Sequence, residues 1–264
     1  MRAAVPVLLL IGCGGAPAPT ASPANTTPTA TADPLRLTAV PRAVGDRFDE
    51  TSHDFYDVMV EGVHIVEVQD YRCAREVRAV VDGAVTEQVT WYHAFHFEQR
   101  RDDQLELGVD LAGHTYRVAV DGGELAITRD DGGALDPVER EQVARDHGDL
   151  GHPMASSALV GTAWVPGVEV ELDAAAQLRF FGEAASGTAT MTLTAATADT
   201  VTFAGGNHRT FDDGVEVTAT GTFIYDRATL RLRHREGSAT LAGAWVGRTE
   251  RRTDITDVPA AAAR

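Results

Sequence analysis

Apolar and polar residues alternate with a period of two along most of the chain after residue 34, as in β-strands that have one buried face. The clearest example is VTEQVTWYHAFHFE at 85–98. Its predicted buried side consists of Val85, Val89, Trp91, Phe95 and Phe97. Its predicted solvent side consists of Thr86, Gln88, Thr90 and Glu98. This alternation predicts a long antiparallel strand that covers a core with one face.

Glycine-containing turns join such segments into hairpins. Asp82-Gly83 precedes the strand at 85–98, and Asp121-Gly122-Gly123 separates HTYRVAV from ELAIT. Asp-Gly and Gly-Gly pairs readily adopt the positive φ angles that tight hairpin turns need. The alternation returns in VEVELD, TATMTLTA and GVEVTATGTFIYDRATLRLR, and the last of these predicts two strands joined around Asp226-Arg227.

One helix is expected between these two sets of strands, at 135–150. Asp136 suits the N-cap position, Pro137 suits the first turn, and Glu139 completes a capping-box pattern. Gly148 suits the end of the helix. A modest buried stripe is expected from Val138, Gln142 and Val143.

The strands before and after the helix have similar layouts. We therefore expect a mainly β fold (all-β or α+β) of two similar antiparallel β-meander halves, at 35–134 and 151–254. The helix at 135–150 links the halves, which are expected to form a sandwich or half-barrels, packed together or sharing one curved sheet. Internal duplication and generic antiparallel patterning both remain open as the source of the likeness. Residues 255–264 are expected to form a disordered tail.

The start of the chain predicts a secretory signal at 1–12. Arg2 supplies positive charge, and the apolar run Ala3–Ile11 is too short to span a bilayer as a helix. Residues 13–34 follow as a Pro/Thr/Ala-rich tract that cannot bury enough apolar surface to fold. We interpret this tract as a disordered tether.

Leu10-Ile11-Gly12-Cys13 resembles the lipobox of bacterial lipoproteins. The resemblance implies transfer of diacylglycerol to the Cys13 sulfur, cleavage between Gly12 and Cys13, and acylation of the new amino group. Several acyl chains would anchor the chain stably to a membrane. Gly14, rather than Asp, follows the cysteine, and the family rule then implies the outer membrane, with the body facing the periplasm or the cell surface. The body is also similar in layout to two-halved β-rich envelope lipoproteins.

The net charge of the chain argues against nucleic acid as a partner. The chain carries 23 Lys and Arg against 39 Asp and Glu, for a formal net charge of −16. Nucleic acid is therefore an unfavourable partner, because phosphate backbones would be repelled. Cys73 has no intramolecular partner once Cys13 is lipidated, so no disulfide framework is expected. It is expected to act as a small hydrophobic residue of a strand.

The histidines provide only weak candidates for a metal site. His93 and His96 lie three residues apart on a strand and should point to opposite faces, with His93 beside the aromatic residues. His147 and His152 near the helix end could converge with Asp149, although a solvated turn is the simpler interpretation. We expect no metal site from these residues.

The remaining motifs are equally weak. Acidic pairs at 102–103, 130–131 and 212–213 lack the regular spacing of a calcium loop and are expected to be solvated loop tips. No nucleophile elbow, phosphate-binding loop or dinucleotide fingerprint occurs. We therefore assign no catalytic, metal-binding or cofactor-binding residues, and expect no cofactor.

Three functions follow as hypotheses. The first is a membrane-anchored envelope lipoprotein that acts as a non-catalytic binding or structural module, with an envelope protein or glycan as partner. The second is a carrier of an apolar ligand or lipid in a β half-barrel. The third is a hydrolase with an unrecognised site, for which Asp149, His147 and His152 are the residues to test.

Overall fold

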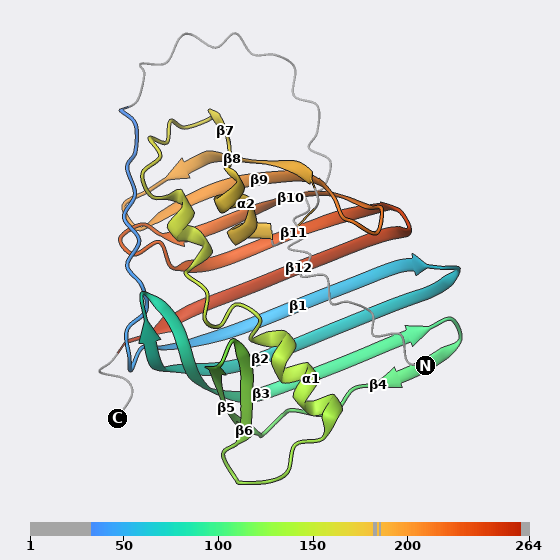
Figure 1. Ribbon diagram of the computed structural model, residues 1–264. Coiled ribbons are helices and arrows are strands. Elements are labelled where there is room, and N and C mark those ends of the chain that lie inside the picture. Colours follow the sequence, from blue (N-terminus) through green and yellow to red (C-terminus); the bar gives the residue numbers. More distant parts are fainter. Residues whose placement is uncertain (1–32, 182–183, 185, 260–264) are drawn as a thin grey trace.

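The structure is a computed structural model that describes residues 33–181, 184 and 186–259. In this part of the chain, twelve antiparallel strands form one open sheet, and two α-helices and a short 3₁₀ helix lie on it (Figure 1). The expectation of a mainly β fold is confirmed. The two meanders share a single sheet.

The first half supplies six strands and the first helix. The strands are β1 (Arg47–Val60), β2 (Val63–Val81), β3 (Ala84–Arg101), β4 (Gln104–Leu107), β5 (Thr115–Asp121) and β6 (Glu124–Arg129). They are followed by α1 (Pro137–Asp146) and the 3₁₀ helix η1 (Ala155–Leu159). All but the short β4 lie in the order β6-β5-β3-β2-β1 from the edge of the sheet to its centre.

The second half supplies the other six strands. They are β7 (Glu169–Glu171), β8 (Ser186–Ala196), β9 (Thr200–Thr210), β10 (Val215–Asp226), β11 (Leu232–Gly243) and β12 (Trp245–Val258). The helix α2 (Ala174–Phe181) lies between β7 and β8 in the sequence. From the centre to the edge, the order is β12-β11-β10-β9-β8-β7.

The first and last strands join the halves. β1 pairs with β12 along its whole length, from Arg47 opposite Val258 to Val60 opposite Trp245. The expected boundary of the second half at 254 is therefore too early. Residues 255–258 belong to β12 rather than to a disordered tail, because β1 provides them with a hydrogen-bonding partner.

Both helices lie on the same side of the sheet, which we call the inner face (Figure 1). Tyr116 of β5 donates a hydrogen bond to Glu139 of α1 at 2.6 Å, and Phe223 of β10 lies against Phe180 of α2 with ring centroids 6.1 Å apart. Strand pairing places Tyr116 and Phe223 on one face, since directly opposite residues point the same way. The other side is the outer face.

Three apolar clusters cover the inner face. The first half contributes a cluster beneath α1 that includes Tyr92, Tyr116 and Val143. The second half contributes a cluster beneath η1 and α2 that includes Trp164, Phe180 and Phe203. The third, which we call the tip cluster, contains no residue of α1, η1 or α2 in the described chain. Its buried members are Val58, Ile65, Val215, Val217, Ala219, Ala239 and Leu241.

The helix α1 begins where the sequence predicts. The Asp136 side chain accepts a hydrogen bond from the Val138 backbone at 2.8 Å, and Glu139 accepts one from the Asp136 backbone at 3.1 Å. This capping box satisfies donors that a helix start leaves free. The buried residues of α1 are Glu139, Gln142 and Val143, whereas Val138 is exposed, contrary to the expected stripe.

The faces of β3 differ from those expected at 85–98. A register shift opposite Arg72 and Cys73 leaves His93 as an extra residue. Such a bulge reverses the sides of the strand. Phe95 and Phe97 therefore lie on the inner face, but Val89 and Trp91 lie on the outer face. The residues on the expected solvent side that become buried are Gln88 and Thr90, at 4% and 0% exposed.

The helix α2 was not expected from the sequence. Asp173 accepts a hydrogen bond from the Ala176 backbone at 2.8 Å and caps its first turn. Phe180 and Phe181 are each 2% exposed and fill the space above β8–β10. Among the residues that the structure describes, no helix is both long and apolar enough to cross a membrane.

Candidate functional site

The centre of the inner face is polar, in contrast to the apolar clusters beside it. One row of directly opposite residues crosses the sheet from β9 to β3 and has aromatic residues at both ends and polar residues between them. It reads Phe203, Phe223, Arg235, Thr253, Ser52, Tyr71 and Phe95. We call the polar inner-face residues of β1, β2, β11 and β12 the central polar band. Its members are Glu50, Ser52, Asp54, Gln69, Tyr71, Arg75, Arg235, Thr249, Arg251 and Thr253.

A buried ion pair forms one part of this band. Glu50 lies 3.0 Å from the Nε of Arg75 and accepts a hydrogen bond from the Tyr71 hydroxyl at 2.7 Å. Burial opposes the charge on Arg75, but Glu50, Cys73 and Tyr71 together outweigh burial and raise the pKa of Arg75. Burial together with the Glu50 charge raises the pKa of Tyr71. The tyrosine therefore stays protonated and acts as a donor.

A second pair joins the two halves of the protein. Arg251 on β12 donates to both carboxylate oxygens of Asp54 on β1, with 2.9 Å between Nη2 and Oδ2. Burial opposes the charge on Arg251, but Asp54 and the nearby Tyr56 together outweigh burial and raise the pKa of Arg251. This two-point contact fixes the orientation of both side chains at the centre of the sheet.

Asp146, at the end of α1, links the helix to the band. Its carboxylate accepts hydrogen bonds from Gln69 at 2.6 Å and from the Tyr92 hydroxyl at 2.7 Å. The terminal nitrogens Nη1 and Nη2 of Arg75 both donate to the Asp146 backbone oxygen at 3.3 Å. Burial raises the pKa of Asp146 to about 6, although these donors favour its charged form.

Arg235 differs from the other arginines of the band. Its Nε donates to the Thr253 hydroxyl at 3.0 Å, and Thr253 in turn contacts Ser52 at 3.2 Å. In the described part of the chain, no carboxylate lies within ion-pair distance of Arg235. Burial and the nearby charge of Arg251 lower the pKa of Arg235. The band therefore holds a cation that lacks a counterion from the described chain.

The structure does not bring His147, His152 and Asp149 together. His147 is fully buried, and its Nδ1 donates to the Val143 backbone oxygen at 2.7 Å. Its Nε2 then accepts from the Thr90 hydroxyl at 2.8 Å. Burial and the Arg75 charge lower the pKa of His147, so it is neutral. His152 and Asp149 are exposed.

The other candidates of the sequence also lie apart. His93 is exposed at the bulge of β3, contrary to the expectation that it lies beside the aromatic residues, and His96 is exposed as expected. All three acidic pairs, at 102–103, 130–131 and 212–213, lie in exposed turns as expected, and Asp131 also contacts Arg129 at 2.7 Å. Across residues 33–181, 184 and 186–259, no group of three His, Cys, Asp or Glu lies close enough to hold a metal ion.

The structure describes Cys73 but not Cys13. Cys73 is 0% exposed, and burial raises the pKa of its thiol to about 12, so it acts as an apolar residue of β2. Cys13 and Gly12, the predicted lipidation and cleavage residues, lie outside the described residues, as does the tether up to residue 32.

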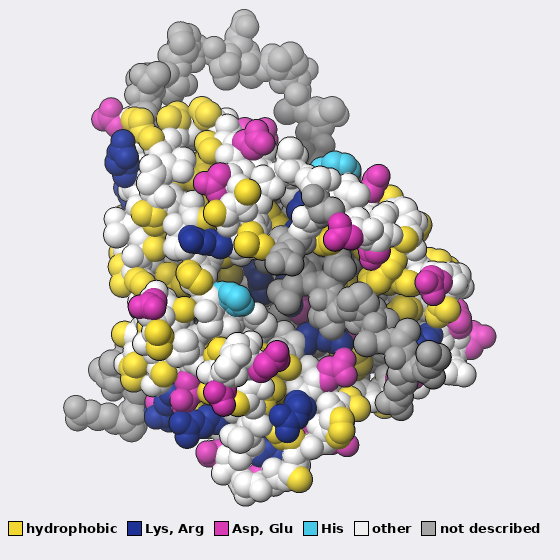
Figure 2. Space-filling model, in the orientation of Figure 1, with side chains coloured by type: hydrophobic (Ala, Val, Ile, Leu, Met, Phe, Trp, Pro, Cys, Tyr) yellow, Lys and Arg dark blue, Asp and Glu magenta, His cyan; other side chains and the backbone are white. Residues whose placement is uncertain are grey.

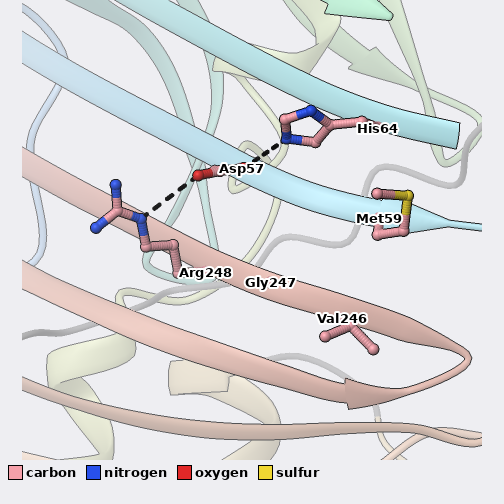
Figure 3. Close-up of a pocket in the computed structure, with 6 residues that line it drawn as sticks. All are labelled: Asp57, Met59, His64, Val246, Gly247 and Arg248. Carbon is pink, nitrogen blue, oxygen red and sulfur yellow. Dashed lines mark hydrogen bonds and ion pairs between the residues drawn. The ribbon is translucent and has the colours of Figure 1, made fainter. Parts of the chain in front are cut away.

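The outer face carries a hollow of about 430 Å³ near the β1–β2 turn (Figure 3). Asp57 lies between two basic groups, 2.8 Å from the Nε2 of His64 and 3.7 Å from the Nε of Arg248. Met59 and Val246 add exposed apolar surface. All six lining residues are exposed or half-buried, so this hollow has little of the desolvation that the inner face provides.

On the face that carries the helices, the charged groups form no single strong patch (Figure 2). Figure 2 shows Asp and Glu side chains spread over the face that carries the helices rather than gathered at one place. Recognition by a broad charged surface is therefore less favoured than recognition at the central polar band, where the charges are few and fixed.

Comparisons with known proteins leave the family open. No protein-family model matches the chain, and no curated protein matches it. Among solved structures, the chain is similar to a lipovitellin, whose structure is titled "Lipid-protein interactions in lipovitellin", at 8% sequence identity and a TM-score of 0.38. The match covers 82% of this chain and 26% of the lipovitellin chain, so this chain spans about a quarter of that protein. A likeness at this level does not establish a shared function.

Proposed function

We propose that this protein is a lipid-anchored, non-catalytic binding protein of the bacterial cell envelope, and that its inner face holds the bound component. The lipobox-like residues around Cys13 support the anchor and the outer-membrane destination. The body then lies at the end of a tether of about twenty residues, free to contact other components of the envelope.

The observation that carries the binding role is the central polar band. Burying charged groups is costly, and replacing a buried ion pair by apolar residues is often neutral or stabilising. A purely structural sheet would therefore need neither the Glu50–Arg75 pair nor Arg235 at its centre. The band places fixed donors and acceptors at the middle of the inner face, as a binding site requires.

A carrier of an apolar ligand is the second candidate, and the tip cluster favours it. Its apolar residues lie on the inner face without a contribution from α1, η1 or α2 in the described chain. An apolar lining of this kind is a common feature of sites for apolar ligands. The two candidates share the inner face and differ in the class of the bound component.

Crosslinking from paired positions tests the binding role. Tyr56 and Phe55 are adjacent aromatic residues of β1 that point to the inner and outer faces respectively. A photoreactive phenylalanine at position 56 should give an adduct with an envelope component in living cells, and the same residue at position 55 should not. Adducts from position 55 alone, or from neither position, would contradict the proposal.

The anchor has its own test. Mass analysis of the mature protein should find an acylated Cys13 as the first residue, and Cys13→Ser should release the protein from the membrane fraction. An unmodified thiol at Cys13, or a polypeptide that still begins at Met1, would refute the anchor without bearing on the inner face.

A further inference from the structure

We propose that the inner face binds an anionic lipid, with the charged head at Arg235 and an acyl chain along β10 and β11 toward the tip cluster. This inference rests on the proposed binding role of the inner face and names the class of ligand. The occupant is a lipid molecule rather than a free anion, because a cationic group and an apolar surface lie along the same two strands.

Small residues form the floor of the proposed site. Gly221 lies opposite Gly237, and Ala219 lies opposite Ala239, on the inner face of β10 and β11. These four positions follow Arg235 directly along the strands. Because they carry at most one methyl group, a ligand can approach the backbone closely there.

The floor continues into the apolar tip cluster. Val217 lies opposite Leu241 as the next inner-face pair, and Val58 and Ile65 extend the cluster onto β1 and β2. From Arg235 to Leu241 the strand covers about 20 Å at its usual rise per residue. This strip is long and apolar, which matches an extended acyl chain.

Arg235 gives the strip a charged end. Its guanidinium uses Nε for Thr253, and within residues 33–181, 184 and 186–259 no carboxylate pairs with it. The neighbouring Arg251 is already paired with Asp54. A phosphate at Arg235 would supply the missing counterion in a partly desolvated place, where charge-assisted hydrogen bonds are strong.

Two buried polar atoms lie between the charged end and the apolar end. Asn207 is opposite Ala219, and Thr249 is opposite Ala239, so both flank the floor. Asn207 Oδ1 and Thr249 Oγ1 have no hydrogen-bond partner in the described chain, although these residues are 6% and 2% exposed. Buried polar atoms are normally satisfied. Because β9 and β12 lie three strands and roughly 14 Å apart, two groups of the lipid head would satisfy these atoms separately. A glycerol hydroxyl would donate to Asn207 Oδ1, and an ester oxygen would accept from Thr249 Oγ1.

Binding of defined probes to the full chain carrying Cys13→Ser tests the proposal, because this variant has no acyl chains of its own. The probes are palmitoyl-lysophosphatidylglycerol, the uncharged monopalmitoylglycerol and glycerol phosphate. Titration calorimetry below the micelle concentration should show the tightest binding for the anionic lipid, weaker binding for the uncharged lipid and none for glycerol phosphate. Equal binding of both lipids, or binding of glycerol phosphate as tight as that of the anionic lipid, would overturn the assignment.

Two variants locate the site. Arg235→Gln should weaken binding of the anionic lipid about tenfold or more and leave the uncharged lipid unchanged, since only a charged contact is lost. Ala239→Leu should weaken both lipids, because it fills the floor. The matched control is Thr240→Leu, which places the same side chain on the exposed outer face and should change neither. An effect of Thr240→Leu equal to that of Ala239→Leu would also refute the site.

Circular dichroism of each variant separates a lost site from a lost fold. Inner-face adducts at position 56 without binding of any lipid probe would leave the proposed binding role standing and refute only the lipid. If position 56 gave no adducts and no lipid probe bound, the proposed binding role and the lipid assignment would both be refuted.

Discussion

The two helices of the inner face are held in different ways. The helix α2 lies on an apolar surface, with Phe180 and Phe181 buried against β8–β10. The helix α1 buries Val143 but also makes polar contacts of a kind that α2 lacks in the described chain: Glu139 binds Tyr116, Asp146 binds Tyr92 and Gln69, and Arg145 binds Glu67 at 2.7 Å. Apolar burial is insensitive to pH, whereas polar contacts depend on protonation. The stability of the first half should therefore change over a pH range in which the stability of the second half stays constant.

The largest effect is expected from α2. Phe180→Ala removes a side chain that is 2% exposed and should lower the free energy of unfolding by about 3–5 kcal/mol, because it leaves a cavity beside Phe223. Urea unfolding followed by tryptophan fluorescence measures this change. Leu178→Ala, on the same helix but 51% exposed, is the control and should change stability little. Equal losses for the two variants would mean that α2 is not held by its buried face.

A smaller, pH-dependent effect is expected from α1. The pKa of Asp146 is raised to about 6 in the folded state, above its value in the unfolded chain. The folded state therefore takes up a proton that the unfolded chain does not, so this residue adds stability as pH falls from 7 toward 4. The gain should be roughly 2 kcal/mol, given 1.36 kcal/mol for each pKa unit.

Asp146→Asn isolates this contribution, because the amide keeps the shape and cannot titrate. As pH falls from 7 to 4, the parent should gain about 2 kcal/mol of unfolding free energy relative to the variant. A difference that stays constant over this range would show that the pKa of Asp146 is not raised. The same comparison for Phe180→Ala should be independent of pH.

The smallest expected effect is in the reactivity of the Cys73 thiol. This thiol is fully buried with a pKa of about 12, so it should not react with a thiol reagent at pH 8 in the native protein. Labelling should occur only after denaturation, and a count of modified thiols by mass measures it. Rapid labelling of the native protein would indicate that the core beneath α1 opens readily.

Features set by neighbouring residues were predictable from the sequence. The capping box of α1 needs only residues 136–139, and the hairpin turns at 82–83 and 121–123 need only their glycines and the flanking alternation. Alternation also places Ala189, Met191 and Leu193 correctly in the core. In each case the residues that predict the feature are the same residues that form it, or lie within a few positions of them.

Features set by distant partners were not predictable. Asp54 and Arg251 are 197 residues apart, and nothing near either residue indicates the other. The strand β1 carries polar residues on both faces, so its alternation gives no sign that Glu50 and Ser52 are buried. The bulge at His93 depends on the register of β3 against β2, which a single strand does not reveal. The central polar band was missed for these reasons.

The pairing of β1 with β12 has a consequence for biogenesis. During synthesis, β1 emerges long before β12, the strand of 14 residues that pairs with it. Until then, the unpaired edge of β1 offers free hydrogen-bonding groups to any other chain nearby. Contacts so distant in sequence also slow folding. A newly made molecule should therefore benefit from a chaperone that shields this edge until β12 pairs with β1.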